Sequence, residues 1–200
     1  MYSPAIDKLI LALKKLPGVG RQTAERYVFH FLKSGKKEVA ELTLALKDLM
    51  TTTQSCQICW NFSDQNPCAR CSQPKRNQAI ICVVAEPQDL AVIEATQAHQ
   101  GSYHVLRGLI DASDEESVLK TKIADLLARC QINTRIKISE VILALNPNLA
   151  GETTMLYLEK KLREQNLTLK ITRLARGLPL GSDIRYADEL TLLSAIKNRT

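Results

Sequence analysis

Four cysteines in two C-x-x-C pairs constrain this 200-residue chain more than any other feature of its sequence. Cys56 and Cys59 form the first pair, and Cys68 and Cys71 form the second pair eight residues later. Two such pairs bring four thiolates within reach of one tetrahedral Zn²⁺, and four sulfur ligands leave no open position for catalysis. The surrounding segment, 54–78, is otherwise polar and loop-like, so a metal would have to order it. The spacing predicts one structural Zn²⁺ per chain; the alternatives are a redox dithiol pair or free cysteines.

The lack of an apolar span and of a signal peptide indicates a cytosolic protein, and this bears on how the cysteines are interpreted. Six cysteines in the reducing cytosol indicate a metal site more than disulfides. No apolar run reaches the ~18 residues that a membrane span needs. The start of the chain, Met1 to Pro4, lacks the charged head and apolar stretch of a signal peptide. We therefore expect a cytoplasmic protein in which Cys82 and Cys130 are packed residues outside the metal site.

From residue 79 onward the sequence alternates between predicted strands and predicted helices. The first strand, 79–85, is an unbroken apolar run, which is typical of a strand buried on both faces of a sheet. Ser113 and Glu116 form a possible capping box for a helix that runs to about Arg129. The remaining strands are predicted at 103–106, 141–145 and 167–174, and the remaining helices at 87–98, 152–164 and 188–197. This alternation predicts an α/β domain with a mostly parallel sheet.

Residues 3–53 are predicted to form three helices, and the turn between the first two has features that favour DNA binding. A proline and two glycines must end the first helix. Gly18 and Gly20 let the backbone turn sharply and remove side chains that would block a ligand. The second helix then begins with free N–H groups, a natural seat for phosphate, and Arg21 and Arg26 lie beside it. This stretch resembles the helix-hairpin-helix DNA-binding motif; the alternative is an ordinary glycine-rich helix turn.

The excess positive charge lies at the same end of the chain. Residues 1–78 contain 12 Lys/Arg against 6 Asp/Glu, whereas residues 79–200 contain 15 of each. Such asymmetry indicates that the N-terminal part meets a polyanion, although charge alone is equally compatible with a solvated basic face. The turn and the charge together predict contacts to phosphate in single- and double-stranded DNA, with little sequence preference. The three histidines are expected to be packed and hydrogen-bonded, not catalytic.

The order of these features resembles the RecR family along the whole chain. A glycine-rich helical hairpin precedes a four-cysteine knuckle and an α/β domain, and the tail agrees with the family pattern at 171–181 and 186–192. The resemblance implies a multi-part α+β chain. Its parts are a helix-hairpin-helix DNA-binding region at 1–53, a zinc finger at 54–78, a Toprim α/β domain at 79–170, and a C-terminal strand, turn and helix at 171–200 for oligomerisation.

The resemblance also implies a function. RecR-family proteins act with RecO, and in some settings with RecF, to load RecA onto single-stranded DNA that is coated by single-strand-binding protein. They assemble as dimers or tetrameric rings. The expected function is therefore that of a non-catalytic recombination mediator in the bacterial cytoplasm, with DNA, RecO and further copies of the chain as its partners.

The predicted Toprim domain lacks acids that catalytic Toprim domains use to collect Mg²⁺. Ala85 stands where a catalytic Glu would end the first strand, and Asn146 and Asn148 stand at the two Asp positions of the Asp-x-Asp pattern. Ala150 replaces an acid that RecR proteins usually carry. The acids that remain nearby are Glu86, Asp89 and Glu152. We expect Mg²⁺ to bind poorly there, and Ala85 and Ala150 put in doubt any partner contact made through those acids.

Two rival functions remain open. A magnesium-dependent Toprim nuclease or topoisomerase-like enzyme would need the missing acidic cluster. A protein-interaction module that never touches DNA would show no salt-dependent DNA binding. The hairpin also departs from the RecR pattern, because Arg21-Gln22 replaces the usual Pro-Lys. The cation has moved one residue toward the turn, so we expect binding with altered geometry.

Overall fold

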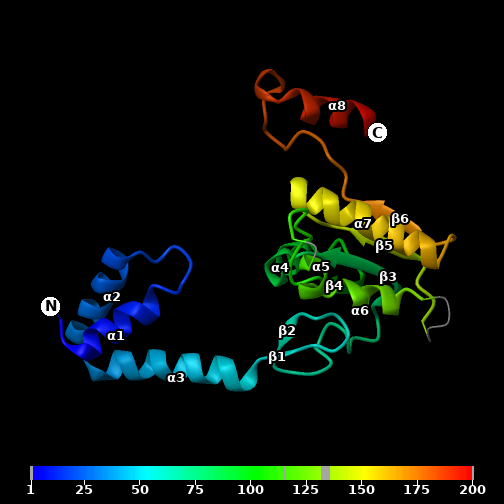
Figure 1. Ribbon diagram of the computed structural model, residues 1–200. Coiled ribbons are helices and arrows are strands. Elements are labelled where there is room, and N and C mark those ends of the chain that lie inside the picture. Colours follow the sequence, from blue (N-terminus) through cyan, green and yellow to red (C-terminus); the bar gives the residue numbers. More distant parts are fainter. Residues whose placement is uncertain (1, 115, 132–135, 200) are drawn as a thin grey trace. The chain divides into compact units, whose positions relative to one another are not determined.

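The chain divides into two units, each with its own hydrophobic core. The computed structural model describes residues 2–114, 116–131 and 136–199 (Figure 1). The first unit ends at Thr53, and the second begins at Gln54.

Three helices make up the first unit: α1 (Pro4–Leu13), α2 (Arg21–Ser34) and α3 (Lys36–Thr52). Ile10, Ala24 and Val28 are buried together where α1 packs on α2. Gly35 separates α2 from α3 with φ +91°, a conformation that favours glycine because it has no Cβ. α3 has no buried residue, although its sequence is rich in leucine. The three predicted helices are confirmed.

The second unit begins with the knuckle, which we define as residues 54–78. Two short strands, β1 (Gln54–Ser55) and β2 (Phe62–Ser63), pair in antiparallel fashion across its first turn. The knuckle has almost no other regular structure. Because it is polar and short of apolar residues, its order depends on the cysteines.

A four-stranded sheet forms the centre of the second unit. Its strands are β3 (Asn77–Val84), β4 (Gly101–Val105), β5 (Glu140–Leu143) and β6 (Lys170–Arg173). They lie in the order β4-β3-β5-β6, and all neighbouring pairs are parallel. The helices along the chain are α4 (Pro87–Ala95), α5 (Ser117–Lys120), α6 (Ile123–Arg129) and α7 (Leu149–Gln165). The predicted parallel α/β domain is confirmed.

Side chains of β3 alternate between two hydrophobic clusters. Ile81 and Val83 pack with α6 and α7 in the larger cluster. Cys82 and Val84 pack with Leu90 of α4 in the smaller cluster. Because helices cover both faces of β3, the strand can be apolar without a break from residue 79 to its end, as its sequence is. Cys82 is therefore a packed residue, as expected.

The capping box predicted at Ser113 and Glu116 does not form. Asp111 Oδ1 accepts hydrogen bonds from both the N–H and the hydroxyl of Ser113, at 2.9 Å and 2.7 Å, so the serine is used in a local turn. The helix begins at Ser117, ends at Lys120 and is followed by the separate helix α6. A single helix to Arg129 was thus a wrong prediction: Asp111 competes for the serine at its start, and the extended backbone of Thr121 ends α5 before α6 begins.

The last segment contains a 3₁₀ helix, Ile184–Tyr186, and helix α8 (Glu189–Lys197). Asp188 caps α8 by accepting the Thr191 N–H at 2.9 Å. α8 has no buried residue. Its apolar side chains, among them Leu190 and Ile196, are exposed.

Candidate zinc and nucleic-acid sites

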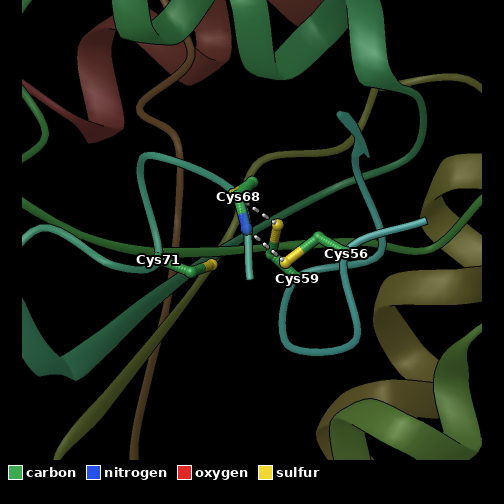
Figure 2. A group of neighbouring side chains, drawn as sticks. All are labelled: Cys56, Cys59, Cys68 and Cys71. Carbon is green, nitrogen blue, oxygen red and sulfur yellow. Dashed lines mark hydrogen bonds between the residues drawn. The ribbon is translucent and has the colours of Figure 1, made fainter. Parts of the chain in front are cut away.

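The four cysteines of the knuckle lie together in one cluster (Figure 2). Their sulfur atoms are all within 4.8 Å of one another, and the sulfurs of Cys59 and Cys68 are 3.6 Å apart. A tetrahedral centre with Zn–S bonds of ~2.3 Å places its sulfurs about 3.8 Å apart. The donor set and its spacing therefore fit one Zn²⁺ ion. When bound, the ion supplies a structural cross-link with no open coordination position.

Local turns direct the cysteines inward. Trp60 N donates to Cys56 O at 2.9 Å, and Ser72 N donates to Cys68 O at 3.0 Å, so a turn closes around each C-x-x-C pair. Cys56, Cys59 and Cys68 are at most 2% exposed. The Cys68 N–H also donates to Cys56 Sγ at 3.4 Å, which stabilises negative charge on that sulfur.

Without a metal, four thiols at this spacing could not all ionise. The hydrogen bond from Cys71 lowers the pKa of Cys59 to about 5, and donating that bond raises the pKa of Cys71 far above its usual value. Burial raises the pKa of Cys68. A divalent cation removes this conflict, because it stabilises all four groups as thiolates.

The glycine turn between α1 and α2 presents backbone N–H groups at an open surface. Gly18 has φ +75°, and no atom lies within 4 Å of the position that a Cβ of Gly18 or Gly20 would occupy. Gly20 is the N-cap of α2 and supplies no capping side chain, so the first N–H groups of α2 remain available. Arg21 is exposed, with its Nε 3.0 Å from Glu25 Oε1, and Arg26 is exposed one turn later. This arrangement suits an anion.

Acids remain near the carboxyl edge of the parallel sheet, and each has a structural partner. Glu86 and Asp89 form the capping box at the start of α4, with Asp89 Oδ2 3.0 Å from Glu86 N. Glu152 Oε2 lies 3.1 Å from Arg173 Nη1, and the other carboxylate oxygen of Glu152 contacts Arg176. These three carboxylates therefore serve helix capping and ion pairing.

Ala85, Asn146 and Asn148 at the same edge are neutral. Ala85 follows β3 and is 3% exposed. Asn148 Oδ1 accepts the N–H of Gly151 at 2.8 Å and so caps α7. A Cβ on Gly151 would lie 1.9 Å from Asn146 O, so this loop packs directly on the helix backbone. Among the described residues, the four cysteines are the one cluster of three or more possible metal-ligating side chains.

Comparison with known proteins covers the chain from end to end. A protein of Moorella thermoacetica named "Recombination protein RecR" is 44% identical over 200 residues, which is 100% of this chain and 98% of the relative. The chain belongs to the RecR family. Family models match in the order of the fold: the RecR helix-hairpin-helix at 6–50, the RecR four-cysteine zinc finger domain at 53–73, the Toprim domain at 79–175 and the RecR C-terminal region at 177–200.

The RecR-family matches confirm one of the two predicted sites, the zinc site. The match to the four-cysteine zinc finger includes Cys56, Cys59, Cys68 and Cys71, and with their geometry it confirms one structural Zn²⁺ per chain. The helix-hairpin-helix match includes the glycine turn. The DNA contacts of Gly18, Gly20, Arg21 and Arg26 stay predictions. Within the described residues, no helix has the length and apolar character needed to span a membrane.

Sequence reasoning missed two structural arginines: Arg107 joins the knuckle to the RecR-family Toprim domain, and Arg129 of α6 bonds to β4 within that domain. Arg107 Nε donates to Trp60 O at 2.8 Å, across 47 positions of sequence. Arg129 Nη1 donates to Tyr103 O at 2.9 Å, and burial lowers its pKa. Neither arginine belongs to a motif, and each partner is remote in sequence, so no local signal could have found them.

Proposed function

We propose that the chain is a non-catalytic, DNA-binding recombination mediator of the bacterial cytoplasm. The observation that carries this proposal is the open glycine turn at the start of α2, flanked by arginines in a unit with nine Lys/Arg and five Asp/Glu between residues 1 and 53. Membership of the RecR family and the printed name of the Moorella relative supply the link to recombination.

DNA contacts the first unit through its backbone phosphates. The N–H groups beside Gly18 and Gly20 and the positive end of α2 take one phosphate. Arg21 and Arg26 neutralise the adjacent phosphates, and for Arg21 this contact competes with the ion pair to Glu25. Such contacts carry no base information, so single and double strands of any sequence bind.

The role of each region follows the RecR family pattern. Residues 1–53 bind DNA, 54–78 form the zinc finger, 79–170 form the Toprim domain, and 171–200 serve oligomerisation. The partners are RecO, in some settings RecF, and further copies of this chain in a dimer or tetrameric ring. Exposed apolar side chains on α3 and α8, two helices without a buried residue, support assembly between copies.

Catalysis is absent because the acids that remain at the sheet edge are already engaged. Mg²⁺ sites for phosphoryl transfer need clustered carboxylates. Here Glu86 and Asp89 cap α4, and Glu152 is held by Arg173 and Arg176. Purified protein with Mg²⁺ or Mn²⁺ should neither cleave nor relax supercoiled DNA, nor synthesise primers. Turnover that disappears in Glu152→Ala would instead establish the Toprim nuclease or topoisomerase-like alternative.

The experiment that tests the mediator function is a RecA-assembly assay. Single-stranded DNA is coated with single-strand-binding protein, and RecA filament growth is followed with RecO alone, with this chain alone and with both. Both together should shorten the lag before RecA assembles, whereas either alone should have little effect. An unchanged lag with both, under conditions in which the chain binds DNA, contradicts a mediator function.

A further inference from the structure

The knuckle meets the sheet at a seam in which two cations lie over two aromatic rings. We define the seam as Trp60, Phe62, Arg107 and Lys122. The guanidinium carbon of Arg107 is 3.7 Å from the centroid of the Phe62 ring, and Lys122 Nζ is 3.9 Å from the centroid of the Trp60 ring. All four residues belong to the second unit, so the seam is part of one compact body.

Backbone strain is concentrated at this seam. Trp60 has φ +61° and Arg107 has φ +60°, and the Arg107 side chain donates from Nε to the backbone O of Trp60 at 2.8 Å. The described residues contain three non-glycine residues with positive φ, and two of them are this bonded pair. Such conformations are unfavourable for residues other than glycine and persist where the surroundings impose them, often at binding sites.

Within the described residues, neither Arg107 nor Lys122 has an ion-pair partner, and burial lowers the pKa of Arg107. Arg107 donates to neutral acceptors, Trp60 O and Ser55 Oγ. In the part of the chain that the structure describes, no carboxylate lies within 4.0 Å of either Arg107 or Lys122. Glu86 acts on Arg107 from beyond that distance. The seam therefore offers two positive charges to an anion.

One ring of the seam also offers an open face. Phe62 is 52% exposed even though Arg107 covers one side of its ring. An exposed ring with a cation behind it provides a surface on which a second flat ring can stack, because every nucleobase has a π face.

The seam has a defined position in the fold. Leu106 N donates to Val84 O, and Lys122 N donates to Leu106 O at 2.7 Å, so both cations are anchored just beyond the carboxyl ends of β3 and β4. The seam therefore lies at the carboxyl edge of the parallel sheet, beside β4.

We propose that the seam is a base-stacking site for single-stranded DNA. An unpaired base stacks on the free face of Phe62, and Arg107 and Lys122 attract the phosphates on either side of it. The site rests on the proposed DNA-binding function and extends it from phosphate contacts at the hairpin to an unpaired base. A duplex cannot use it, because its bases are already stacked and paired.

Trp60 provides a direct probe, because it is the single tryptophan of the chain. The zinc-loaded full chain is titrated with an oligothymidylate, with an abasic strand of the same length and with a duplex, while tryptophan emission is followed. The oligothymidylate should change the Trp60 emission, and the abasic strand and the duplex should leave it nearly unchanged. Unchanged emission at saturating oligothymidylate overturns the proposal.

Variants of Phe62 separate stacking from a purely structural clamp. Phe62→Ala should weaken oligothymidylate binding about tenfold with duplex affinity unchanged, whereas Phe62→Tyr should retain binding. Equal losses for single strand and duplex, or no loss, overturn the proposal. Tyr186→Ala, which removes an exposed ring elsewhere in the same unit, is the matched control. If Phe62→Ala loses its zinc, the wild-type titration decides alone.

The hairpin variant keeps this proposal distinct from the proposed function. Replacing Arg21 and Arg26 with Ala should weaken single-strand and duplex binding together and leave the emission change at saturation intact. If that variant binds both DNAs normally, the hairpin assignment is wrong and the base-stacking proposal is retained. If only Phe62→Ala leaves DNA binding unchanged, the base-stacking proposal is wrong and the hairpin assignment is retained.

Discussion

At the residue scale, His104 shows how burial fixes a protonation state. It is fully buried in β4, with Nε2 2.8 Å from Lys122 O and Nδ1 3.2 Å from Arg129 Nη1. A guanidinium can only donate, so Nδ1 accepts and Nε2 carries the proton. Burial, with help from the charge of Arg129, lowers the pKa of His104 to about 3. It is a packed histidine, as the sequence led us to expect.

This neutral histidine predicts a loss of stability in mild acid. His104 takes up a proton near pH 6.5 in the unfolded chain but only near pH 3 in the folded chain. Its contribution to the free energy of unfolding is therefore complete above pH 6.5 and falls as pH decreases toward 3. Between pH 7.5 and 5.5, His104 should remove about 1.4 kcal/mol from the free energy of unfolding of the second unit.

Urea unfolding followed by Trp60 emission measures this loss. His104→Asn should reduce the difference between the two pH values by that amount, although the variant is less stable at both. His30, which the sequence predicted to be packed, is instead exposed in the first unit. His30→Asn should leave the difference unchanged, because Trp60 reports on the second unit. An identical pH difference in His104→Asn and wild type would contradict the buried neutral state.

Residues whose role follows from local spacing were predictable, and residues that act through remote contacts were not. The four cysteines were identified because C-x-x-C spacing alone places two thiolates at one ion. Ala24, a small residue next to the glycine turn in sequence, is fully buried where α1 packs on α2. Arg107 and Trp60 gave no such signal, since their bond joins positions 47 residues apart.

At the element scale, the knuckle owes its order to its metal. Its strands β1 and β2 have two residues each, and its buried cluster consists of cysteines. Cys59 O also accepts the N–H of Val105 at 2.8 Å, which joins the knuckle to β4. Loss of zinc should therefore loosen the knuckle and the adjoining end of β4.

Cys59→Ser tests this dependence. The variant should lose its zinc, and hydrogen exchange should quicken in the knuckle and at Val105, while α2 keeps its protection because it belongs to the other unit. Cys82→Ala, a buried cysteine outside the cluster, should retain one zinc per chain by elemental analysis. Native protein without stoichiometric zinc, or Cys59→Ser that retains zinc, would contradict the site.

Elements with a strong periodic or apolar signal were predictable, but their ends were not. The apolar run at 79–85 marks a strand covered on both faces, and both clusters contain side chains of β3. The strand expected from residue 167 starts at Lys170, because Asn166 Oδ1 accepts the N–H of Thr168 and holds a turn there. Competition by Asp111 for Ser113 likewise decided where α5 begins, and sequence spacing does not resolve such local competition.

At the scale of the whole molecule, the exposed apolar helices predict a homo-oligomer. Leu46 in α3 is 56% exposed and Leu193 in α8 is 47% exposed, which is costly for a monomer in water. Light scattering at micromolar concentration should give a mass above that of one chain. Leu46→Asp and Leu193→Asp should each reduce it, whereas Leu119→Asp, at an exposed site on α5, should not. A wild-type protein that is monomeric throughout contradicts the prediction.

The measurement that decides most directly whether the first unit binds DNA is a salt titration of binding. Binding is followed by fluorescence anisotropy of labelled DNA between low and moderate salt. The DNAs are a single strand and a duplex, each in two unrelated sequences. The proteins are wild type, the double variant Arg21→Ala with Arg26→Ala, and the control Arg185→Ala. Wild type should bind all four DNAs, with affinity that falls steeply as salt rises. The double variant should bind all four more weakly, and its log–log slope should be lower by about two on duplex, since each phosphate contact releases about 0.9 counterion. Unchanged affinity and slope in the double variant would contradict a phosphate site at the glycine turn.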